Sequence, residues 1–316
     1  MMESKPSFSN HRKVDILLAT YNGERYLAEQ IESLLNQTYP AIHLLIRDDA
    51  SIDNTPLIIK SYLSKFPDRI TFFQGRKRQG VKANFSQLMK ASTSSYLMFS
   101  DQDDVWKPNK VEKSLSCMLA MENQYGELPL LVHSDLTVVD ENLHLLDPSF
   151  WHYTHLKSHH SSSLNRLLTQ NVVTGCTIMI NRLLNEMARP IPHEAFMHDW
   201  WLALTASAFG QIGVINEATL YYRQHSTNTL GAQKFFNFYN MKKKLHKWRQ
   251  TDEKKFQQAL IFYQRYQKLL SLSQQKVLKD FSKLAQLPWM KRKKTVYCHG
   301  FFKQGWVRNL ADFFLG

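Results

Sequence analysis

The sequence has 316 residues, of which 43% are apolar and 21% are charged, a composition typical of a globular protein rather than a disordered one. Its formal net charge is +13, but residues 234–316 hold 19 Lys and Arg against 4 Asp and Glu, whereas residues 1–233 hold 21 against 23. Because the excess positive charge is confined to one end, the composition argues against a uniformly basic nucleic-acid-binding protein.

The first part of the chain alternates between short apolar runs and segments with helical spacing. We predict strands over residues 14–19, 43–46, 70–73 and 96–99, and helices over residues 24–35, 54–63, 80–89 and from Lys107-Pro108 onward. Alternation of this kind is typical of a parallel sheet covered by helices. The sequence therefore predicts an α/β fold.

Polar clusters follow three of these strands. They are Thr20-Tyr21-Asn22, Asp48-Asp49 and the sequence DQDD at residues 101–104. In a parallel sheet, ligands bind beyond the carboxyl ends of the strands. We therefore expect the three clusters to meet at one edge of the sheet and to form a binding site there.

The rest of the chain mixes strands and helices. We predict strands over residues 130–136 and 172–180, a mobile loop over the His- and Ser-rich residues 152–163, a helix over 199–209 and two short strands within 213–222. After Gly231 the pattern changes to long amphipathic helices rich in Lys and Arg. We therefore place a boundary here, with residues 1–232 forming the α/β domain and residues 233–316 a basic helical appendage.

The acidic cluster at residues 101–104 carries the most chemical information. Asp101 and Asp103 are two residues apart, and in an extended stretch such residues share a face. Carboxylate oxygens suit Mg²⁺ or Mn²⁺, and such an ion would neutralise a diphosphate leaving group. The alternative is an acidic turn that caps the helix near Pro108. The position after a buried strand, beside the other polar clusters, favours the metal site.

Taken together, these motifs resemble the family 2 glycosyltransferases, which have a GT-A fold with a mixed, mainly parallel sheet. The similar segments are LLATYNGERYLAEQIESLLNQTYP (17–40), LIRDDASIDNT (45–55), FSDQDDVWKPNK (99–110), VTGCTIMINR (173–182), HDWWLALTASAFGQIGVI (198–215) and YYRQHSTNTLGA (221–232). The resemblance divides the catalytic domain into a nucleotide-binding half, residues 14–110, and an acceptor half, residues 111–232. Within the family, the last two segments are most similar to bacterial rhamnosyltransferases that build cell-wall or capsular polysaccharides.

The resemblance assigns a nucleotide-binding role to the first two polar clusters. Residues of the loop after the first strand would hold the donor nucleotide; they are Thr20, Tyr21, Asn22 and Glu24. One of Asp48 and Asp49, with Asp49 preferred, would read the pyrimidine base, since a carboxylate can accept the N3–H of uracil or thymine. The alternative is that one of the pair only caps or orders the following turn.

The resemblance also implies a metal site. Asp103 would bind the metal directly, with Asp101 nearer the ribose and sharing the ion, and Asp104 would lie behind them. His225 matches a position where related enzymes place a histidine on the metal, and imidazole suits Mn²⁺. A lone histidine can equally be structural or solvated.

Asp199 matches the catalytic base of the family. The usual pair at this point is Glu-Asp, whereas this chain has His198-Asp199, so the departure concerns the first position only. A carboxylate base that accepts the acceptor hydroxyl proton implies a single displacement with inversion at the anomeric carbon. The alternative is that Asp199 caps the helix that follows it.

Four further residues are candidates for contact with the donor or acceptor sugar. Gly175 and Cys176 would lie close to a substrate, where a small residue leaves room. Trp200 and Trp201 could stack on a sugar ring, although core packing is an equal alternative. We do not expect a catalytic cysteine, because the sequence shows no activating partner.

The predicted function is an inverting, metal-dependent transfer of a sugar from a nucleotide diphosphate donor to a polysaccharide or lipid-linked glycan, and by resemblance the donor is dTDP-L-rhamnose. The alternatives are a transferase that uses a UDP-hexose or UDP-N-acetylhexosamine and, less readily, a nucleotidyltransferase. A nucleotidyltransferase usually has a Gly-rich basic loop after the first strand, and TYNGERYL is not of that type. The acidic clusters would repel nucleic acid.

We expect a cytoplasmic protein that is peripheral on the plasma membrane. The N-terminus lacks the apolar core of a signal peptide, no apolar run is long enough to span a bilayer, and the three cysteines are far apart. We expect residues 256–287 to pack on the catalytic domain. Residues 289–316 combine the basic run 291–294 with a row of apolar residues and are predicted to dock on anionic lipid; the apolar row is Phe302, Trp306, Leu310 and Phe313.

Overall fold

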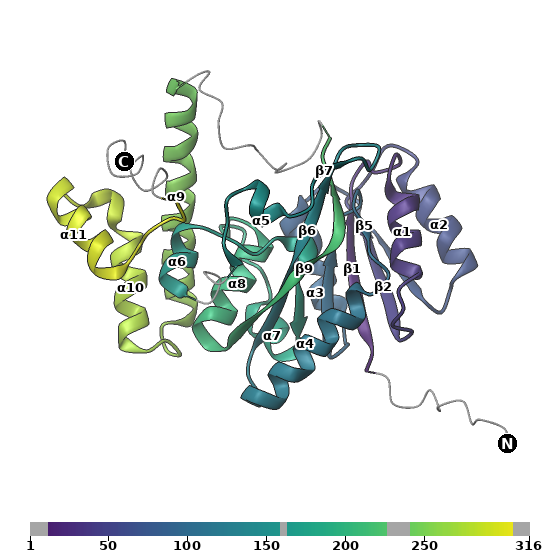
Figure 1. Ribbon diagram of the computed structural model, residues 1–316, viewed down its shortest axis with the longest axis horizontal. Helices are drawn as coiled ribbons and strands as arrows, with labels where there is room; N and C mark the ends of the chain where they lie inside the picture. The colour runs from purple at the N-terminus through teal and green to yellow at the C-terminus, as the bar shows by residue number, and fades with distance from the viewer. Residues whose placement is uncertain (1–11, 159–162, 226–240, 306–316) are drawn as a thin grey trace.

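A sheet of nine strands forms the centre of the molecule in the computed structural model, which describes residues 12–158, 163–225 and 241–305 (Figure 1). The strands are β1 (Val14–Thr20), β2 (Ile42–Asp48), β3 (Ile70–Gln74), β4 (Tyr96–Ser100), β5 (Val105–Trp106), β6 (Leu130–Val139), β7 (Leu145–Asp147), β8 (Met179–Asn181) and β9 (Gln211–Arg223). Their order is β3-β2-β1-β4-β8-β6-β9-β5, with β7 paired to β6. The sheet is mixed, as expected from the sequence.

Helices cover both faces of this sheet. They are α1 (Leu27–Leu35), α2 (Thr55–Lys65), α3 (Val81–Ala91), α4 (Lys110–Tyr125), α5 (Phe150–Tyr153), α6 (Leu164–Thr169), α7 (Arg182–Ala188), α8 (His198–Phe209), α9 (Met241–Tyr266), α10 (Leu272–Ser282) and α11 (Trp289–His299). The short 3₁₀ turns are η2 (Gly175–Thr177) and η3 (Leu284–Gln286). The fold is therefore α/β, with α9–α11 following the sheet.

The parallel strands β3, β2, β1 and β4 bring the polar clusters to one edge. Thr20 pairs in register with Asp48 across β1 and β2, and Leu18 pairs with Ser100 across β1 and β4. The residues that follow these strands therefore emerge side by side. The predicted meeting of the three clusters at the carboxyl edge is confirmed.

Burial of both faces of β1 explains why four successive residues, Ile16 to Ala19, are apolar. Leu17 belongs to the core cluster that includes residues of α3 and α6–α10 on one face, whereas Ile16 and Leu18 belong to the cluster with residues of α1, α2 and α4 on the other. All three side chains are fully buried. A strand covered on both faces has no exposed side that would require polar residues.

The second half of the sheet departs from the sequence predictions. Residues 172–180 do not form one strand, because the chain turns through η2 before the short, antiparallel β8. The two short strands predicted within residues 213–222 are one strand, β9, whose pairing with β6 shifts register between Ser134 and Thr137. The exposed pair Asn216-Glu217 falls near this shift, which explains why the sequence indicated a break there. Helix α4 begins at Lys110 rather than Lys107, and β5 and β7 were not predicted.

Helices α9 and α10 extend the core on the α8 side. The ring of Phe262 lies 5.2 Å from that of Trp201, and Tyr266 lies 4.7 Å from Phe262. Arg265 donates hydrogen bonds to the carbonyl oxygens of Arg189 and Pro190, each at 2.6 Å. The predicted boundary at residues 232/233 lies outside the described residues, as do residues 159–162 of the predicted loop. Within the described ranges, none of the helices combines the length and the apolar character needed to cross a membrane.

Candidate active site

The loop after β1 is tied to the turn after β2. Thr20 Oγ1 donates to Asp48 Oδ1 at 3.1 Å, and Asp48 Oδ2 accepts the backbone N–H of Ser51 at 2.8 Å. Asp48 is fully buried. Its carboxylate therefore orders the turn at residues 48–51, which is the structural role foreseen for one member of the pair.

Asp49 connects the same edge to the start of α3. Its Oδ2 accepts the backbone N–H groups of Gln79 at 2.9 Å and Gly80 at 2.7 Å, and its Oδ1 accepts a guanidinium N–H of Arg47 at 3.2 Å. Arg47 in turn donates to Asn84 at 2.7 Å. A pyrimidine that approached Asp49 would share oxygens that already accept hydrogen bonds from the protein.

Gln102, in the acidic cluster, holds the loop after β1 in place. Its side-chain oxygen accepts the backbone N–H of Tyr21 at 2.8 Å, and its Nε2 donates to the Tyr21 carbonyl at 3.0 Å. A Cβ on Gly23 would lie 2.4 Å from Gln102 Oε1, so a side chain at position 23 would disrupt these hydrogen bonds. The two bonds fix the loop after β1 against residues 101–104.

Asn22 and Glu24 brace this loop from its other side. Asn22 Oδ1 accepts the backbone N–H of Ile52 at 3.0 Å, and Glu24 Oε2 accepts Asn54 Nδ2 at 2.8 Å. The backbone of Asn22 lies in the left-handed region, with φ 47°, a conformation that asparagine tolerates better than most residues. Asn22 and Glu24 therefore hold the shape of this loop.

The predicted metal ligands Asp103 and His225 are in contact. His225 Nε2 lies 2.8 Å from Asp103 Oδ2, and the carbonyl of Asp103 accepts a hydrogen bond from Arg223 Nε at 3.0 Å. The ring of His225 lies 5.1 Å from that of Tyr26, which also lies under the guanidinium of Arg223. Residues far apart in the sequence are thus fixed around one carboxylate.

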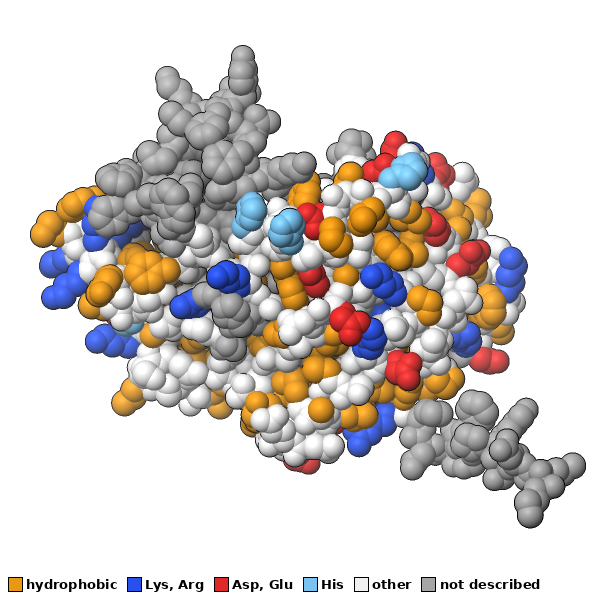
Figure 2. Space-filling model, in the orientation of Figure 1, with side chains coloured by type: hydrophobic (Ala, Val, Ile, Leu, Met, Phe, Trp, Pro, Cys, Tyr) orange, Lys and Arg blue, Asp and Glu red, His pale blue; other side chains and the backbone are white. Residues whose placement is uncertain are grey.

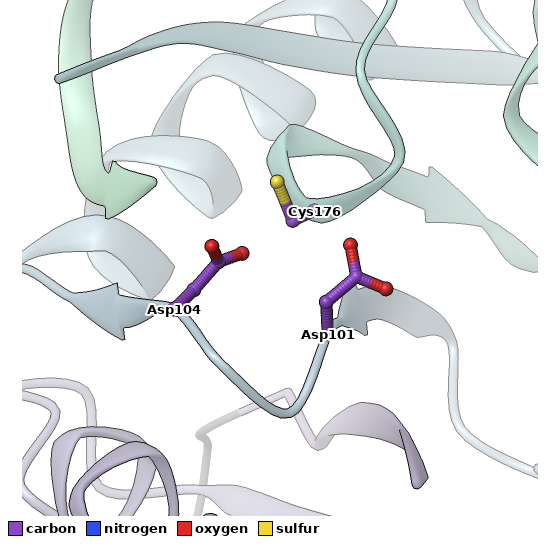
Figure 3. A group of neighbouring side chains, drawn as sticks. All are labelled: Asp101, Asp104 and Cys176. Atoms are coloured by element: carbon purple, nitrogen blue, oxygen red, sulfur yellow. The ribbon is translucent and has the colours of Figure 1, made fainter. Parts of the chain in front are cut away.

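A second group of potential ligands lies on the inner side of the cluster. Asp101, Asp104 and Cys176 point toward one another, with their ligand atoms all within 4.8 Å (Figure 3). Asp104 is fully buried and neither of its oxygens has a hydrogen-bond partner among the described residues. Burial, followed by the charges of Asp103 and Asp101, raises the pKa of Asp104 well above its usual range. Lys110, also buried, lies close enough to oppose this shift.

The carboxylates of the acidic cluster and of α8 meet in the same site. Burial and then the charges of Asp103 and Asp199 raise the pKa of Asp101 to about 7. Burial likewise raises the pKa of Asp199 to about 7, partly offset by hydrogen bonds from the Trp200 and Gly175 backbone and from the Asn171 side chain. Asp199 therefore lies within electrostatic reach of the acidic cluster, with a pKa suited to proton transfer near neutral pH.

Asp199 is not the N-cap of α8. The N-cap is Met197, and Asp199 lies in the first turn, where Oδ1 accepts its neighbour's backbone N–H, that of Trp200, at 2.6 Å. The preceding His198 is buried between Phe85 and Phe99, at ring-centroid distances of 4.2 and 5.5 Å, and burial lowers its pKa to about 3. The residue that replaces the usual glutamate is thus a neutral core imidazole.

The space beside the Cα of Gly175 is occupied by the ring of His198 and is not open to solvent. A Cβ at position 175 would lie 2.9 Å from His198 Nε2 and 3.7 Å from the Cβ of Asp199. Cys176 is buried, and burial raises the pKa of its thiol well above the usual range. The thiol therefore stays protonated, in keeping with the expectation that it is not a nucleophile.

Trp200 and Trp201 belong to the core. They are 6% and 0% exposed, and their indole N–H groups donate to the carbonyls of Leu167 at 2.6 Å and Ala188 at 3.1 Å. Neither ring offers a free face to a sugar. The alternative of core packing is therefore correct, and the prediction of stacking on a sugar ring is wrong.

Sequence reasoning missed three residues that shape the site: Gln102, Asn171 and Arg223. Gln102 and Arg223 lie inside motifs used for the resemblance, but their partners are 81 and 120 residues away. Asn171 precedes η2 without any recognisable motif. Only the fold reveals these contacts.

Comparisons with known proteins agree with this geometry. Residues 15–125 match the model of the family described as Glycosyl transferase family 2. The dTDP-rhamnosyl transferase RfbG of Shigella flexneri is 28% identical over 227 residues, which cover 68% of this chain and 74% of RfbG. The putative glycosyltransferase EpsE of Bacillus subtilis is 36% identical over 104 residues, 33% of this chain and 37% of EpsE.

Solved structures share the fold at lower identity. Residues 1–349 of S. aureus TarS, in complex with UDP-GlcNAc, superpose with a TM-score of 0.53 at 18% identity, covering 90% of this chain and 83% of that fragment. The mannosyltransferase PcManGT from Pyrobaculum calidifontis, in complex with GDP-Man and Mn²⁺, gives 0.53 at 14% identity, covering 96% and 84%. From its motifs, its sheet and these matches, residues 15–125 belong to glycosyltransferase family 2, whose members are enzymes that use a nucleotide sugar, and the chain has a GT-A fold.

Proposed function

We propose that this enzyme transfers L-rhamnose from dTDP-L-rhamnose to a growing, lipid-linked bacterial polysaccharide, with inversion at the anomeric carbon. The observation that carries the proposal is the position of Asp199 beside Gly175, whose neighbour Cys176 lies against Asp101 and Asp104, because this brings a base and a leaving-group site together. Support for rhamnose comes from the similarity to RfbG over 68% of the chain.

In the proposed reaction Asp199 acts as the general base. Its carboxylate takes the proton of an acceptor hydroxyl while that oxygen forms a bond to the anomeric carbon, and the bond from this carbon to the diphosphate breaks on the opposite face. The diphosphate leaves with the electron pair. A pKa of about 7 leaves Asp199 able to accept a proton at neutral pH.

The residues present fit a divalent cation on the outer side of the acidic cluster. Asp103 and His225, in contact at 2.8 Å, and Asp101 would hold Mg²⁺ or Mn²⁺, which when bound neutralises charge on the diphosphate. The inner group is a poorer candidate, because Asp104 and Cys176 are fully or almost fully buried and a thiol is a poor ligand for Mg²⁺. Asp104 therefore supports the ligands from behind.

The donor loop is proposed to hold the nucleotide through Tyr21 and the base through Asp49. Arg78 lies over the ring of Tyr21 at 4.0 Å, which adds a positive charge beside the loop. The alternative donor is a UDP-hexose or UDP-N-acetylhexosamine, a possibility supported by the UDP-GlcNAc bound to TarS, which shares the fold.

A donor screen tests the proposal. The purified protein would be incubated with dTDP-L-rhamnose, UDP-glucose, UDP-galactose, UDP-GlcNAc or GDP-mannose, with Mn²⁺ or with chelator, and nucleotide release and thermal stabilisation would be measured. We expect metal-dependent release from dTDP-L-rhamnose above all others. Selective turnover of a UDP-sugar would establish the alternative donor instead.

A lipid-linked acceptor places the reaction at a membrane surface. We propose that the enzyme acts at the inner, anionic face of the plasma membrane, where such an acceptor is held. The basic C-terminal residues are the part of the chain that fits this location, since they carry the excess positive charge.

A further inference from the structure

Among the described residues, helix α11 contacts the rest of the protein through Val296 and His299. Val296 packs against the apolar core, and His299 Nε2 lies 2.7 Å from Asp280 Oδ2 on α10. The carbonyl of His299 accepts a hydrogen bond from Asn165 Nδ2 at 2.7 Å. These contacts fix the orientation of α11 and decide which of its residues face outward.

Beside these contacts, α11 exposes large apolar side chains next to basic ones. Trp289, Met290 and Tyr297 are 58%, 74% and 79% exposed. Helical spacing places Trp289, Lys293 and Tyr297 in one row, with Met290 and Lys294 in the row beside it. We call these five residues the outer face of α11. Figure 2 shows hydrophobic and basic side chains side by side at this end of the molecule.

The outer face differs from the apolar faces of α9 and α10. Phe262 of α9 and Phe281 of α10 are 0% and 2% exposed and are used within the core. Around α11 the aromatic surface continues instead to Phe302, whose ring lies 6.4 Å from that of Tyr297 and which is 41% exposed. Residues 289–299 contain no Asp or Glu. The face therefore carries aromatic side chains, and all of its charged side chains are basic.

We infer that the outer face of α11 docks on an anionic phospholipid surface, an inference that rests on the lipid-linked acceptor of the proposed function. Tryptophan and tyrosine rings are suited to the boundary between headgroups and acyl chains, and lysines beside them attract lipid phosphates. Lys293 Nζ lies 3.4 Å from the centre of the Trp289 ring, so both groups would reach the lipid together. Helix α2 lies at the other end of the molecule from α11 (Figure 1).

The test measures flotation of the full-length protein with vesicles of phosphatidylcholine, with or without phosphatidylglycerol. We expect binding only when the anionic lipid is present, and weaker binding at higher salt. Each lysine near such a surface contributes about fivefold to partitioning, so K293Q/K294Q should bind roughly 25-fold more weakly. W289S/Y297S should also lose binding, because it removes the aromatic anchors. The matched controls on α2, K60Q/K65Q for charge and L57S for exposed apolar area, should bind like the parent protein.

Circular dichroism and release of nucleotide from the donor in solution should be unchanged in the α11 variants, which separates lost docking from misfolding. Vesicle binding that persists in both α11 variants, or no binding by the parent protein at low salt, would overturn the inference. A dimer in sedimentation experiments that W289S/Y297S converts to a monomer, without vesicle binding, would show that a second copy covers this face instead. If the donor screen fails while vesicle binding behaves as described, the proposed donor is wrong and the docking surface stands.

Discussion

The two groups of carboxylates at the carboxyl edge of the sheet differ in their hydrogen bonding and in their pKa values. Asp48 and Asp49 accept hydrogen bonds from backbone N–H groups and from Arg47, and these bonds hold the surrounding loops in place. In the other group, Asp104 has no hydrogen-bond partner among the described residues, and the pKa values of Asp101 and Asp199 are raised to about 7.

This difference separates carboxylates that hold the site in shape from carboxylates that take part in the reaction. A carboxylate whose lone pairs are satisfied by the protein contributes to the shape of the site. Partly or fully buried carboxylates that lie close to one another are costly for the fold, and such groups concentrate where a cation or a proton is bound during the reaction. The predictions below test this division.

The largest effect is expected from the outer carboxylate of the acidic cluster. Asp103→Ala should abolish measurable transfer, a loss of roughly 10⁴-fold, because the diphosphate would lose several kcal/mol of stabilisation as it leaves. Excess chelator should have the same effect on the parent enzyme, and exposed Asp68→Asn serves as the control. Full activity in chelator would show that transfer needs no metal.

Asp199→Asn should lower kcat by roughly 10²–10⁴-fold while donor binding is retained, since the amide keeps the shape but cannot take the proton. In the parent enzyme kcat/KM should rise with pH through about 7, because the carboxylate acts only when deprotonated and its pKa is raised to about 7. This rise should become shallower in the variant, in which Asp101, whose pKa in the parent enzyme is about 7, still titrates. Exposed Glu194→Gln, five residues earlier, is the matched control. Near-parental turnover by Asp199→Asn would rule out its role as the base.

Replacing a carboxylate that holds the site in shape should lower stability and weaken donor binding instead. Asp49→Asn weakens the hydrogen bonds to Gly80 and Arg47 and should cost about 1–3 kcal/mol of the free energy of unfolding. Denaturant unfolding measures this loss, and kinetics should show a higher donor KM with a smaller change in kcat. If kcat fell as far as in Asp199→Asn while stability stayed constant, Asp49 would take part in the reaction rather than hold the site in shape.

Most of the nucleotide-binding half could be predicted from the sequence because its signals are local. Buried parallel strands such as β1 are short apolar runs, and the polar residues that follow them necessarily emerge at one edge. The acceptor half was harder to predict. Residues 172–180 have the composition of a strand, but Gly175 must pass close to His198 and the chain turns there instead.

The detailed contacts of the site could not be predicted, because they depend on distant partners. Gln102 reads as one polar residue among several, yet it holds Tyr21 across 81 residues of sequence. The approach of Cys176 to Asp104 follows from the antiparallel placement of β8 beside β4, and the sequence carries no sign of that pairing.

The smallest effect is expected from Cys176, although it lies closest to the buried carboxylates. Its thiol is buried and its pKa is raised well above the usual range, so it stays protonated and has no nucleophilic part in the reaction. Cys176→Ala should therefore change kcat less than threefold and cost about 1 kcal/mol of stability through the small cavity it leaves. Cys117→Ala, in the half-buried surface of α4, is the matched control for removal of a thiol. Thiol-directed reagents should modify exposed Cys298 first and leave transfer to a soluble acceptor intact. Loss of activity in Cys176→Ala at unchanged stability would instead show that Cys176 takes part in the reaction.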